Sequence, residues 1–213
     1  MKQQEKAARK LLESLGADRE TADTLIREGR EAGSVADSIS GKNLWSLKPE
    51  KGIALYAAAR YTEPDLCVET GVGPGVSTTF TLSALERTGK GMLHSIDLGV
   101  KYGDEEEVYE VGFLVPPLLR KRWTLHTGDA GKLIRPLLEE LGDIQFFLHD
   151  SRHTYRHVML ELSEVWKHMR RGIIFVDNCT WTGAPSDFAR RAGAQVLNLS
   201  DEAGGFCAIR KKI

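Results

Sequence analysis

Short apolar segments alternate with longer amphipathic ones along the chain after Pro64, and this alternation restricts the fold more than any other feature. Apolar runs end at Thr70, Asp129 and Asp150, and a stretch with helical periodicity follows each of them. This pattern predicts βαβ units and a mainly parallel sheet. The runs are apolar at successive positions, as expected for strands that helices cover on both faces. The chain is therefore predicted to be an α/β protein.

The C-terminal residues depart from this alternation. Residues 194–200 and 204–211 are both strand-like, and too few residues separate them for a crossover helix. They predict an antiparallel hairpin at one edge of the sheet. Seven strands are expected in total, with the last one antiparallel to its neighbours.

The first sixty residues are predicted to be helical. One helix ends near Gly16, a second runs from about Asp18 to Gly33, and a third begins at about Pro49. Residues 33–43 are small and polar, which predicts a connection that can serve as a lid. We therefore expect a helical cap over residues 1–48 and the main domain over residues 49–213.

The composition argues against several classes of protein. The chain has 213 residues, of which 41% are apolar, and a net charge of −1, so no basic excess points to nucleic acid. No apolar run approaches the roughly 20 residues that span a bilayer, and the N-terminus lacks the apolar core of a signal peptide. Three widely spaced cysteines argue against a disulfide framework or a structural zinc site. We expect a cytoplasmic protein with no membrane partner, whose acidic run at residues 103–107 is a solvated loop.

A glycine-rich loop follows the first predicted strand. Gly71, Gly73 and Gly75 permit a sharp turn and the close approach of a ligand. A dinucleotide-binding loop has the spacing G-x-G-x-x-G, whereas Val76 occupies the third glycine position here. Glu69 adds a carboxylate that repels a pyrophosphate and suits a ligand with an ammonium group. These features disfavour an NAD-dependent oxidoreductase.

The segment from Glu69 to Gly75 resembles the first motif of the class I S-adenosylmethionine-dependent methyltransferases, E/D-x-G-x-G-x-G. The resemblance covers about residues 50–213 and implies a Rossmann-like sheet of seven strands in the order 3-2-1-4-5-7-6. It also implies that Asp97 binds the ribose hydroxyls of S-adenosylmethionine and that Asp129 faces the adenine amino group, although either acid could instead cap a helix or loop. The cofactor-binding residues expected on this basis are Glu69, Gly71, Gly73, Gly75, Ser77, Asp97, Asp129 and Ala130.

Oxygen-bearing side chains stand at the ends of the fourth and fifth predicted strands. Asp150 closes the fourth strand, and Asp177 and Asn178 close the fifth. Ligands of an open parallel sheet bind at the carboxyl ends of its strands. If the two strands are neighbours, the three side chains meet there and suit a hard divalent cation such as Mg²⁺.

Asp150 and the segment VDNCTWTG (residues 176–183) resemble the metal-dependent O-methyltransferases of the catechol and caffeoyl-coenzyme A type. The resemblance implies that Asp150, Asp177 and Asn178 are the metal ligands. That family has a lysine base three residues after the first aspartate, where this chain has His153. A neutral histidine can accept a hydroxyl proton near pH 7. The segment HDSRHTY also resembles a bacterial methyltransferase branch with H-D-S-x-H-T-Y. This resemblance supports a methyl-transfer activity more strongly than it supports the use of a metal ion.

Other interpretations of these residues stay open at this point. His153 and His157 have a spacing that could bind zinc with Asp150, but the glutamate of an HExxH motif is missing. His149 is interpreted as a packed or capping histidine. Tyr155 and Trp181 could each line the acceptor pocket or pack against the fold.

The predicted function is S-adenosylmethionine-dependent O-methylation of a small-molecule hydroxyl, assisted by a divalent metal such as Mg²⁺. His153 and Asp150 are the expected catalytic residues. A metal-independent methyltransferase, an NAD-dependent oxidoreductase and a non-catalytic cofactor-binding protein are the alternatives. The N-terminal helices could pair subunits in a homo-oligomer.

Overall fold

The computed structural model of the protein describes residues 3–33, 46–103, 108–200 and 203–212. It contains two compact units, which are described separately: the first comprises residues 1–63, 72–93 and 99–124, and the second comprises the rest. The lid and the acidic loop expected from the sequence fall mostly on residues 34–43 and 104–107, which lie outside the described residues. The division into a cap and a main domain stays a prediction.

The first unit contains the predicted N-terminal helices. Asp18 caps the second of them by accepting a hydrogen bond from the Thr21 amide at 2.8 Å. The helices that carry Gly52 and Phe80 pack closely, because a Cβ atom on Gly52 would lie only 2.2 Å from the ring of Phe80. Helix α4 packs against α1, α2 and α5. The helical elements of this unit are α1 (Gln3–Leu15), α2 (Arg19–Ala32), α4 (Pro49–Thr62), α5 (Val76–Thr88) and the 3-10 helix η1 (Pro117–Arg122).

The main sheet has seven strands in the order β5-β2-β1-β6-β7-β9-β8. Numbered along the chain, this is the predicted order 3-2-1-4-5-7-6, and the Rossmann-like fold is confirmed. Strand β6 pairs in parallel with β1 and β7, whereas β9 is antiparallel to both β7 and β8, which confirms the edge hairpin. The strands are β1 (Leu66–Thr70), β2 (Met92–Asp97), β5 (Trp123–Thr127), β6 (Phe146–His149), β7 (Gly172–Asp177), β8 (Val196–Ser200) and β9 (Phe206–Lys211).

A small second sheet was not expected from the sequence. It consists of β3 (Tyr102–Gly103) and β4 (Val108–Tyr109), which pair antiparallel. Strands of two residues are too short to show the alternation by which a strand is recognised. Within the described part of the chain, no helix combines the length and the apolar character needed to cross a membrane.

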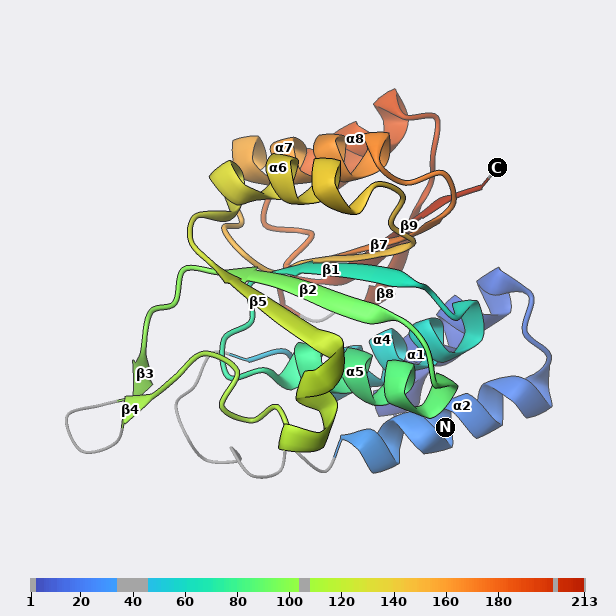
Figure 1. The fold of residues 1–213 in the computed structure, drawn as a ribbon. Coiled ribbons are helices and arrows are strands. Elements are labelled where there is room, and N and C mark those ends of the chain that lie inside the picture. The colour runs from blue at the N-terminus through green and yellow to red at the C-terminus, as the bar shows by residue number, and fades with distance from the viewer. Residues whose placement is uncertain (1–2, 34–45, 104–107, 201–202, 213) are drawn as a thin grey trace. The chain divides into compact units, whose positions relative to one another are not determined.

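Three helices of the second unit lie side by side on one face of the sheet, as Figure 1 shows: α6 (Ala130–Leu141), α7 (Tyr155–Lys167) and α8 (Ala184–Arg191). Val68, Phe147 and Ile174 are aligned across β1, β6 and β7 and are fully buried against these helices. Since side chains alternate along a strand, the residues two positions later face the same helices. That row consists of Thr70, His149 and Val176.

Candidate active site

The carboxyl ends of β6 and β7 place the predicted acceptor-site residues next to one another. Asp150 follows the row of Thr70 and His149 directly, and its amide donates a hydrogen bond to the Thr70 carbonyl at 2.8 Å. Asp177 is the last residue of β7 and is 6% exposed. Both carboxylates therefore stand at the same edge of the sheet, where parallel α/β sheets bind their ligands.

The four predicted residues of this edge form one cluster. His153 Nε2 lies 3.7 Å from Asp150 Oδ1 and 3.1 Å from Asn178 Nδ2. The same amide nitrogen donates a hydrogen bond to Asp177 Oδ2 at 3.3 Å. The Asn178 amide N–H faces His153 Nε2, and in the tautomer that accepts this hydrogen bond Nε2 carries the lone pair.

Two carboxylates and one amide supply oxygen atoms of the kind that Mg²⁺ takes. Asn178 directs its amide nitrogen toward Asp177. A rotation of the amide group would exchange nitrogen and oxygen, so that the oxygen could ligate a cation there. The set fits a hard cation in kind. Among the residues that the structure describes, no group of three or more His, Cys, Asp or Glu side chains could hold a metal ion.

Gly204, between β8 and β9, contacts this cluster through Asn178. Gly204 accepts a hydrogen bond from the Thr180 amide at 3.0 Å, and a Cβ atom on Gly204 would lie 2.1 Å from Asn178 Oδ1. Asn178 itself has a left-handed backbone, with φ of 50°. Trp181 packs edge-on against the His153 ring at 5.1 Å and is 57% exposed. The exposed indole thus stands beside the imidazole, and its role as a wall of an acceptor pocket stays a prediction.

Glu69 and Gly71 lie at the end of β1 in the second unit. Glu69 is 2% exposed and accepts a hydrogen bond from the Ser95 hydroxyl at 2.8 Å. A Cβ atom on Gly71 would lie 2.0 Å from the Asp150 carbonyl oxygen, and Gly71 has φ of 84°. The missing side chain at Gly71 thus lets the start of the glycine loop rest on the turn after β6.

Gly75 has a different neighbour, in the first unit. It precedes α5 with φ of 100°, and a Cβ atom on it would lie 2.8 Å from Val115 Cγ2 and 3.0 Å from Gly112 Cα. The Gly112 amide also donates a hydrogen bond to the Gly73 carbonyl at 2.8 Å. Residues 112–115 therefore cover part of the loop, and Gly75 is needed for that packing. The expected role of the glycines in ligand approach stays a prediction.

The two acids after β2 and β5 both lie at strand ends, as expected. Asp97 is the last residue of β2 and is 8% exposed. Asp129 caps α6, because its Oδ1 accepts a hydrogen bond from the Gly131 amide at 2.8 Å. The capping interpretation of Asp129 is thus confirmed, and its contact with adenine stays a prediction. Ser77 and Ala130 are both buried.

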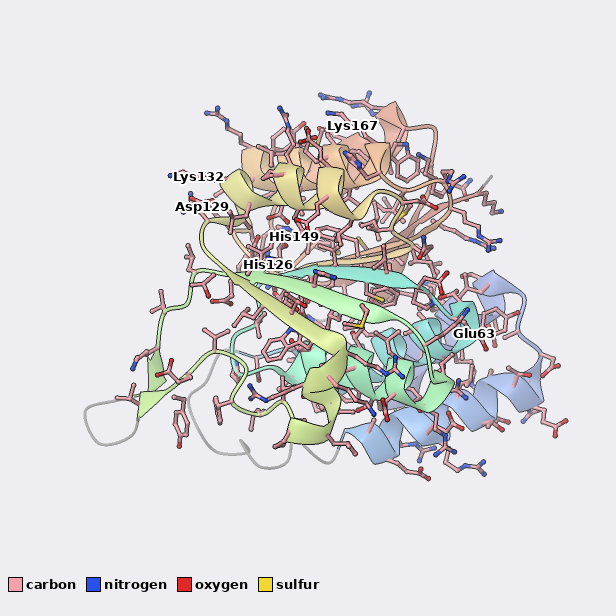
Figure 2. The ribbon with its side chains drawn as sticks, in the orientation of Figure 1. Glu63, His126, Asp129, Lys132, His149 and Lys167 are labelled. Carbon is pink, nitrogen blue, oxygen red and sulfur yellow. The ribbon has the colours of Figure 1, made fainter. Side chains whose placement is uncertain are left out.

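Glu161 is the important residue that sequence reasoning missed. It is fully buried on α7 and binds His149, which is fully buried as predicted. Figure 2 shows His149 beneath α6, and Asp129 at the start of that helix. The signal was present in the sequence, because Glu161 is in helical phase with the buried Val158 and Leu162.

One smaller expectation is corrected, and one disfavoured alternative finds no support. Tyr155 does not pack on the sheet: it is 41% exposed and its hydroxyl donates to Asp187 Oδ2 of α8 at 2.9 Å. The first turn of α7 leaves this side chain in solvent. His157 Nε2 lies 2.7 Å from Glu161 Oε1, so it pairs with that carboxylate, and zinc with Asp150 and His153 finds no support.

The family of the chain follows from comparison with known proteins. A sequence-family model described as a methyltransferase domain matches residues 68–179, which is more than half of the chain. The matched segment runs from β1 through the glycine loop to the end of β7 and includes the clustered acceptor-site residues. The chain therefore belongs to the methyltransferase-domain family.

Solved structures share the fold. An O-methyltransferase from Bacillus cereus in complex with SAH is 15% identical, with a TM-score of 0.59, 85% of this chain and 90% of that chain covered. The O-methyltransferase TomG from Streptomyces achromogenes, involved in tomaymycin synthesis and in complex with SAM, is 16% identical, with a TM-score of 0.60 and coverage of 87% and 90%. A Staphylococcus aureus protein assigned as a caffeoyl-CoA O-methyltransferase is 8% identical, with a TM-score of 0.63 and coverage of 85% and 92%.

These likenesses show the class I methyltransferase fold, and the family match places the chain among the methyltransferase-domain proteins. No curated protein matches the sequence significantly. A shared fold does not assign an acceptor or a metal, so these depend on the residues of the site.

Proposed function

We propose that the protein transfers a methyl group from S-adenosylmethionine to a hydroxyl group of a small molecule. The observation that carries this proposal is the cluster of Asp150, His153, Asp177 and Asn178 at the ends of two adjacent parallel strands. It joins a proton acceptor, two carboxylates and an amide at one edge of the sheet. The Bacillus cereus and Streptomyces achromogenes neighbours, described as complexes with SAH and SAM, support the choice of cofactor.

The cofactor site proposed here uses the glycine loop and the acids at the strand ends. Asp97 would bind the ribose hydroxyls, Asp129 the adenine amino group, and Glu69 would complement the ammonium group of the methionine part. The burial of Glu69 and Asp97 restricts their carboxylates to short-range partners. The proposed residues are Glu69, Gly71, Gly73, Gly75, Ser77, Asp97, Asp129 and Ala130.

His153 is the proposed general base, and Asp150 is its partner. The acceptor hydroxyl gives its proton to His153 Nε2, and its oxygen attacks the methyl carbon of the sulfonium. The carbon–sulfur bond breaks and its electron pair stays on sulfur, which leaves the thioether S-adenosylhomocysteine. Asp150 Oδ1, 3.7 Å from Nε2, stabilises the imidazolium that forms.

Asp150, Asp177 and Asn178 are proposed to hold a divalent cation. Such a cation would lower the pKa of the acceptor hydroxyl and align it for attack. A metal-independent methyltransferase is the second candidate, because the pairing of His153 with Asp150 can move the proton without an ion. The two candidates differ in the role of Asp150: a ligand in the first, and only a partner of the histidine in the second.

Chelation separates these candidates. The wild-type protein is incubated with labelled S-adenosylmethionine and a panel of phenols, sugars and other hydroxyl acceptors, with EDTA or with Mg²⁺. The metal-dependent enzyme loses activity with EDTA and regains it with Mg²⁺, and Asp150→Ala loses the response. Asp143→Ala is the matched control, because Asp143 pairs with Arg170 outside the cluster. Activity that is unchanged by EDTA would contradict the metal-dependent candidate. Failure to methylate any acceptor of the panel would count against hydroxyl methylation.

The three cysteines are free thiols, which fits a reducing compartment, and we propose a cytoplasmic enzyme. Trp181, exposed beside His153, is the proposed wall of the acceptor site.

A further inference from the structure

Helix α7 carries a carboxylate that no step of the proposed reaction uses. Glu161 has a side chain that is 0% exposed, and both of its oxygen atoms accept hydrogen bonds. Oε2 accepts from the Thr70 hydroxyl at 2.6 Å and from His149 Nδ1 at 2.6 Å. Oε1 accepts from the Ser151 hydroxyl at 2.9 Å and from His157 Nε2 at 2.7 Å. Four donors therefore fill the lone-pair positions of one buried carboxylate.

Glu161 is ionised in the folded protein. Burial on its own would raise the pKa of this carboxyl, but the hydrogen bonds from His149 and His157 outweigh it and lower the pKa to about 2. A buried anion of this kind is weak evidence for stability, because apolar side chains of the same size often do as well. Its partners therefore need to be considered for what else they do.

The partners of Glu161 flank the candidate active site. His149 and Ser151 are the residues immediately before and after Asp150. The Thr70 carbonyl accepts a hydrogen bond from the Asp150 amide. Thr70 also precedes Gly71, which packs closely against the Asp150 carbonyl. One carboxylate thus holds the chain on both sides of Asp150 and at the strand end beside it.

The same carboxylate reaches His153 through one intermediate ring. His149 donates to Glu161 through Nδ1, and its ring meets the ring of His153 at 5.3 Å in an edge-to-face arrangement. The hydrogen bond to Glu161 fixes the orientation of the His149 ring, and that ring limits where His153 can stand.

Ser151, His157 and Glu161 do not form a nucleophilic triad. Both the Ser151 hydroxyl and the Glu161 carboxylate approach His157 at Nε2, at 3.2 Å and 2.7 Å. A triad needs the acid on one ring nitrogen and the hydroxyl on the other. Moreover, the Ser151 hydroxyl donates its hydrogen bond to Glu161. The cluster is therefore suited to holding the turn and not to hydrolysis.

We propose that Glu161 is a positioning residue for methyl transfer, which holds residues 149–153 so that Asp150 and His153 face the acceptor. This inference rests on the proposed function of that site. It assigns Glu161 no contact with the acceptor or the cofactor. Its loss should therefore reduce turnover while leaving cofactor affinity nearly unchanged.

The test compares Glu161→Gln with Glu164→Gln. Glutamine keeps the shape of the side chain, but its amide nitrogen cannot accept hydrogen bonds, so two of the four donors lose their acceptor. Glu164 lies one turn further along α7, is also buried, and pairs with Arg135 and Lys167. The same substitution on the same helix thus removes a carboxylate without touching the turn.

The first readout is steady-state kinetics with the acceptor that wild-type protein methylates best. A misplacement of about 1 Å can cost about a hundredfold in rate. Glu161→Gln should therefore lower kcat by about a hundredfold, with a calorimetric Kd for S-adenosylhomocysteine within about threefold of wild type. Glu164→Gln should leave both values unchanged. A folded Glu161→Gln protein with wild-type kcat would overturn the proposal, even if its melting temperature falls.

The second readout needs no acceptor. Hydrogen–deuterium exchange of residues 150–154, measured with S-adenosylhomocysteine bound, should be at least about tenfold faster in Glu161→Gln and unchanged in Glu164→Gln. If Glu161→Gln does not fold, Ser151→Ala takes its place, because it removes one tether and keeps the carboxylate; unchanged exchange and unchanged kcat in that variant would contradict the proposal. Wild-type protein that binds no S-adenosylhomocysteine would instead refute the proposed function, which keeps the two failures distinct.

Discussion

Gly204 offers a sharp test of the acceptor site, because it lies outside every element that carries a proposed catalytic residue. A Cβ atom on this glycine would stand 2.1 Å from Asn178 Oδ1, whereas ordinary contacts begin at 3.4 Å. In Gly204→Ala, the Asn178 amide must therefore move by about 1.3 Å or rotate away. Asn178 Nδ2 contacts both His153 and Asp177, so the displacement reaches the proposed base.

The magnitude follows from that displacement. A shift of about 1 Å in catalytic geometry can cost about a hundredfold in rate. Gly204 also has φ of 87°, so alanine there adds a backbone cost of about 1–2 kcal/mol. Gly193→Ala is the matched control: this glycine has φ of 64°, and a Cβ atom on it would meet nothing within 4 Å. Gly204→Ala should lose at least as much stability as Gly193→Ala, and only Gly204→Ala should lose activity.

The assay measures kcat/KM with the best hydroxyl acceptor, together with thermal unfolding and the side-chain amide signals of Asn178 by NMR. Gly204→Ala should lower kcat/KM by about a hundredfold and shift those signals. In an Asn178→Ala background the methyl group that Gly204→Ala introduces has no amide to displace, so the second substitution should cause little further loss. Equal activity of the Gly204→Ala and Gly193→Ala proteins would refute the reasoning.

Three further predictions follow from individual contacts. Gly71→Ala would place a Cβ atom 2.0 Å from the Asp150 carbonyl, so it should reduce both cofactor affinity and turnover, and an effect on only one of them would contradict the contact. Against the effect of burial, hydrogen bonds from His149 and His157 lower the folded pKa of Glu161 from 4.5 to about 2, so the contribution of its ionised form to stability is complete above pH 4.5 and is lost as pH falls toward 2; the difference in unfolding free energy between wild type and Glu161→Gln should shrink over that range. His94 has its pKa lowered by burial and by the neighbouring His126, so the unfolded chain takes up this proton first and stability falls as pH drops below about 6.5; His94→Gln should weaken that dependence in chemical denaturation, and an unchanged slope would contradict it.

The fold was predictable because its signals are local. Apolar runs that end in Asp97, Asp150 and Asp177 mark buried strands, and the absence of a crossover helix before β9 indicates the terminal hairpin. The strand order came from family resemblance, since periodicity alone does not say which strands are neighbours. The paired strands β3 and β4 were missed because two residues show no period.

The site was predictable only in part, for a similar reason. Residues at strand ends can be placed from sequence, and Asp150, Asp177 and Asn178 do come together. Contacts across the fold have no local signal. The helical phase of Glu161 indicates that it is buried but not which residues it contacts, and the dependence of Asn178 on Gly204 joins two loops 26 positions apart in the sequence.

The most direct test of the central claim is a calorimetric titration of the protein with S-adenosylmethionine. Wild-type protein should bind one equivalent, and NAD⁺ should not compete. Gly73→Val should abolish binding, because a side chain would stand where the cofactor approaches the loop. Gly89→Val, with φ of 82° and open space around the Cβ position, should bind normally. No binding by the wild type, or unchanged affinity in Gly73→Val, would contradict the assignment of this loop to S-adenosylmethionine.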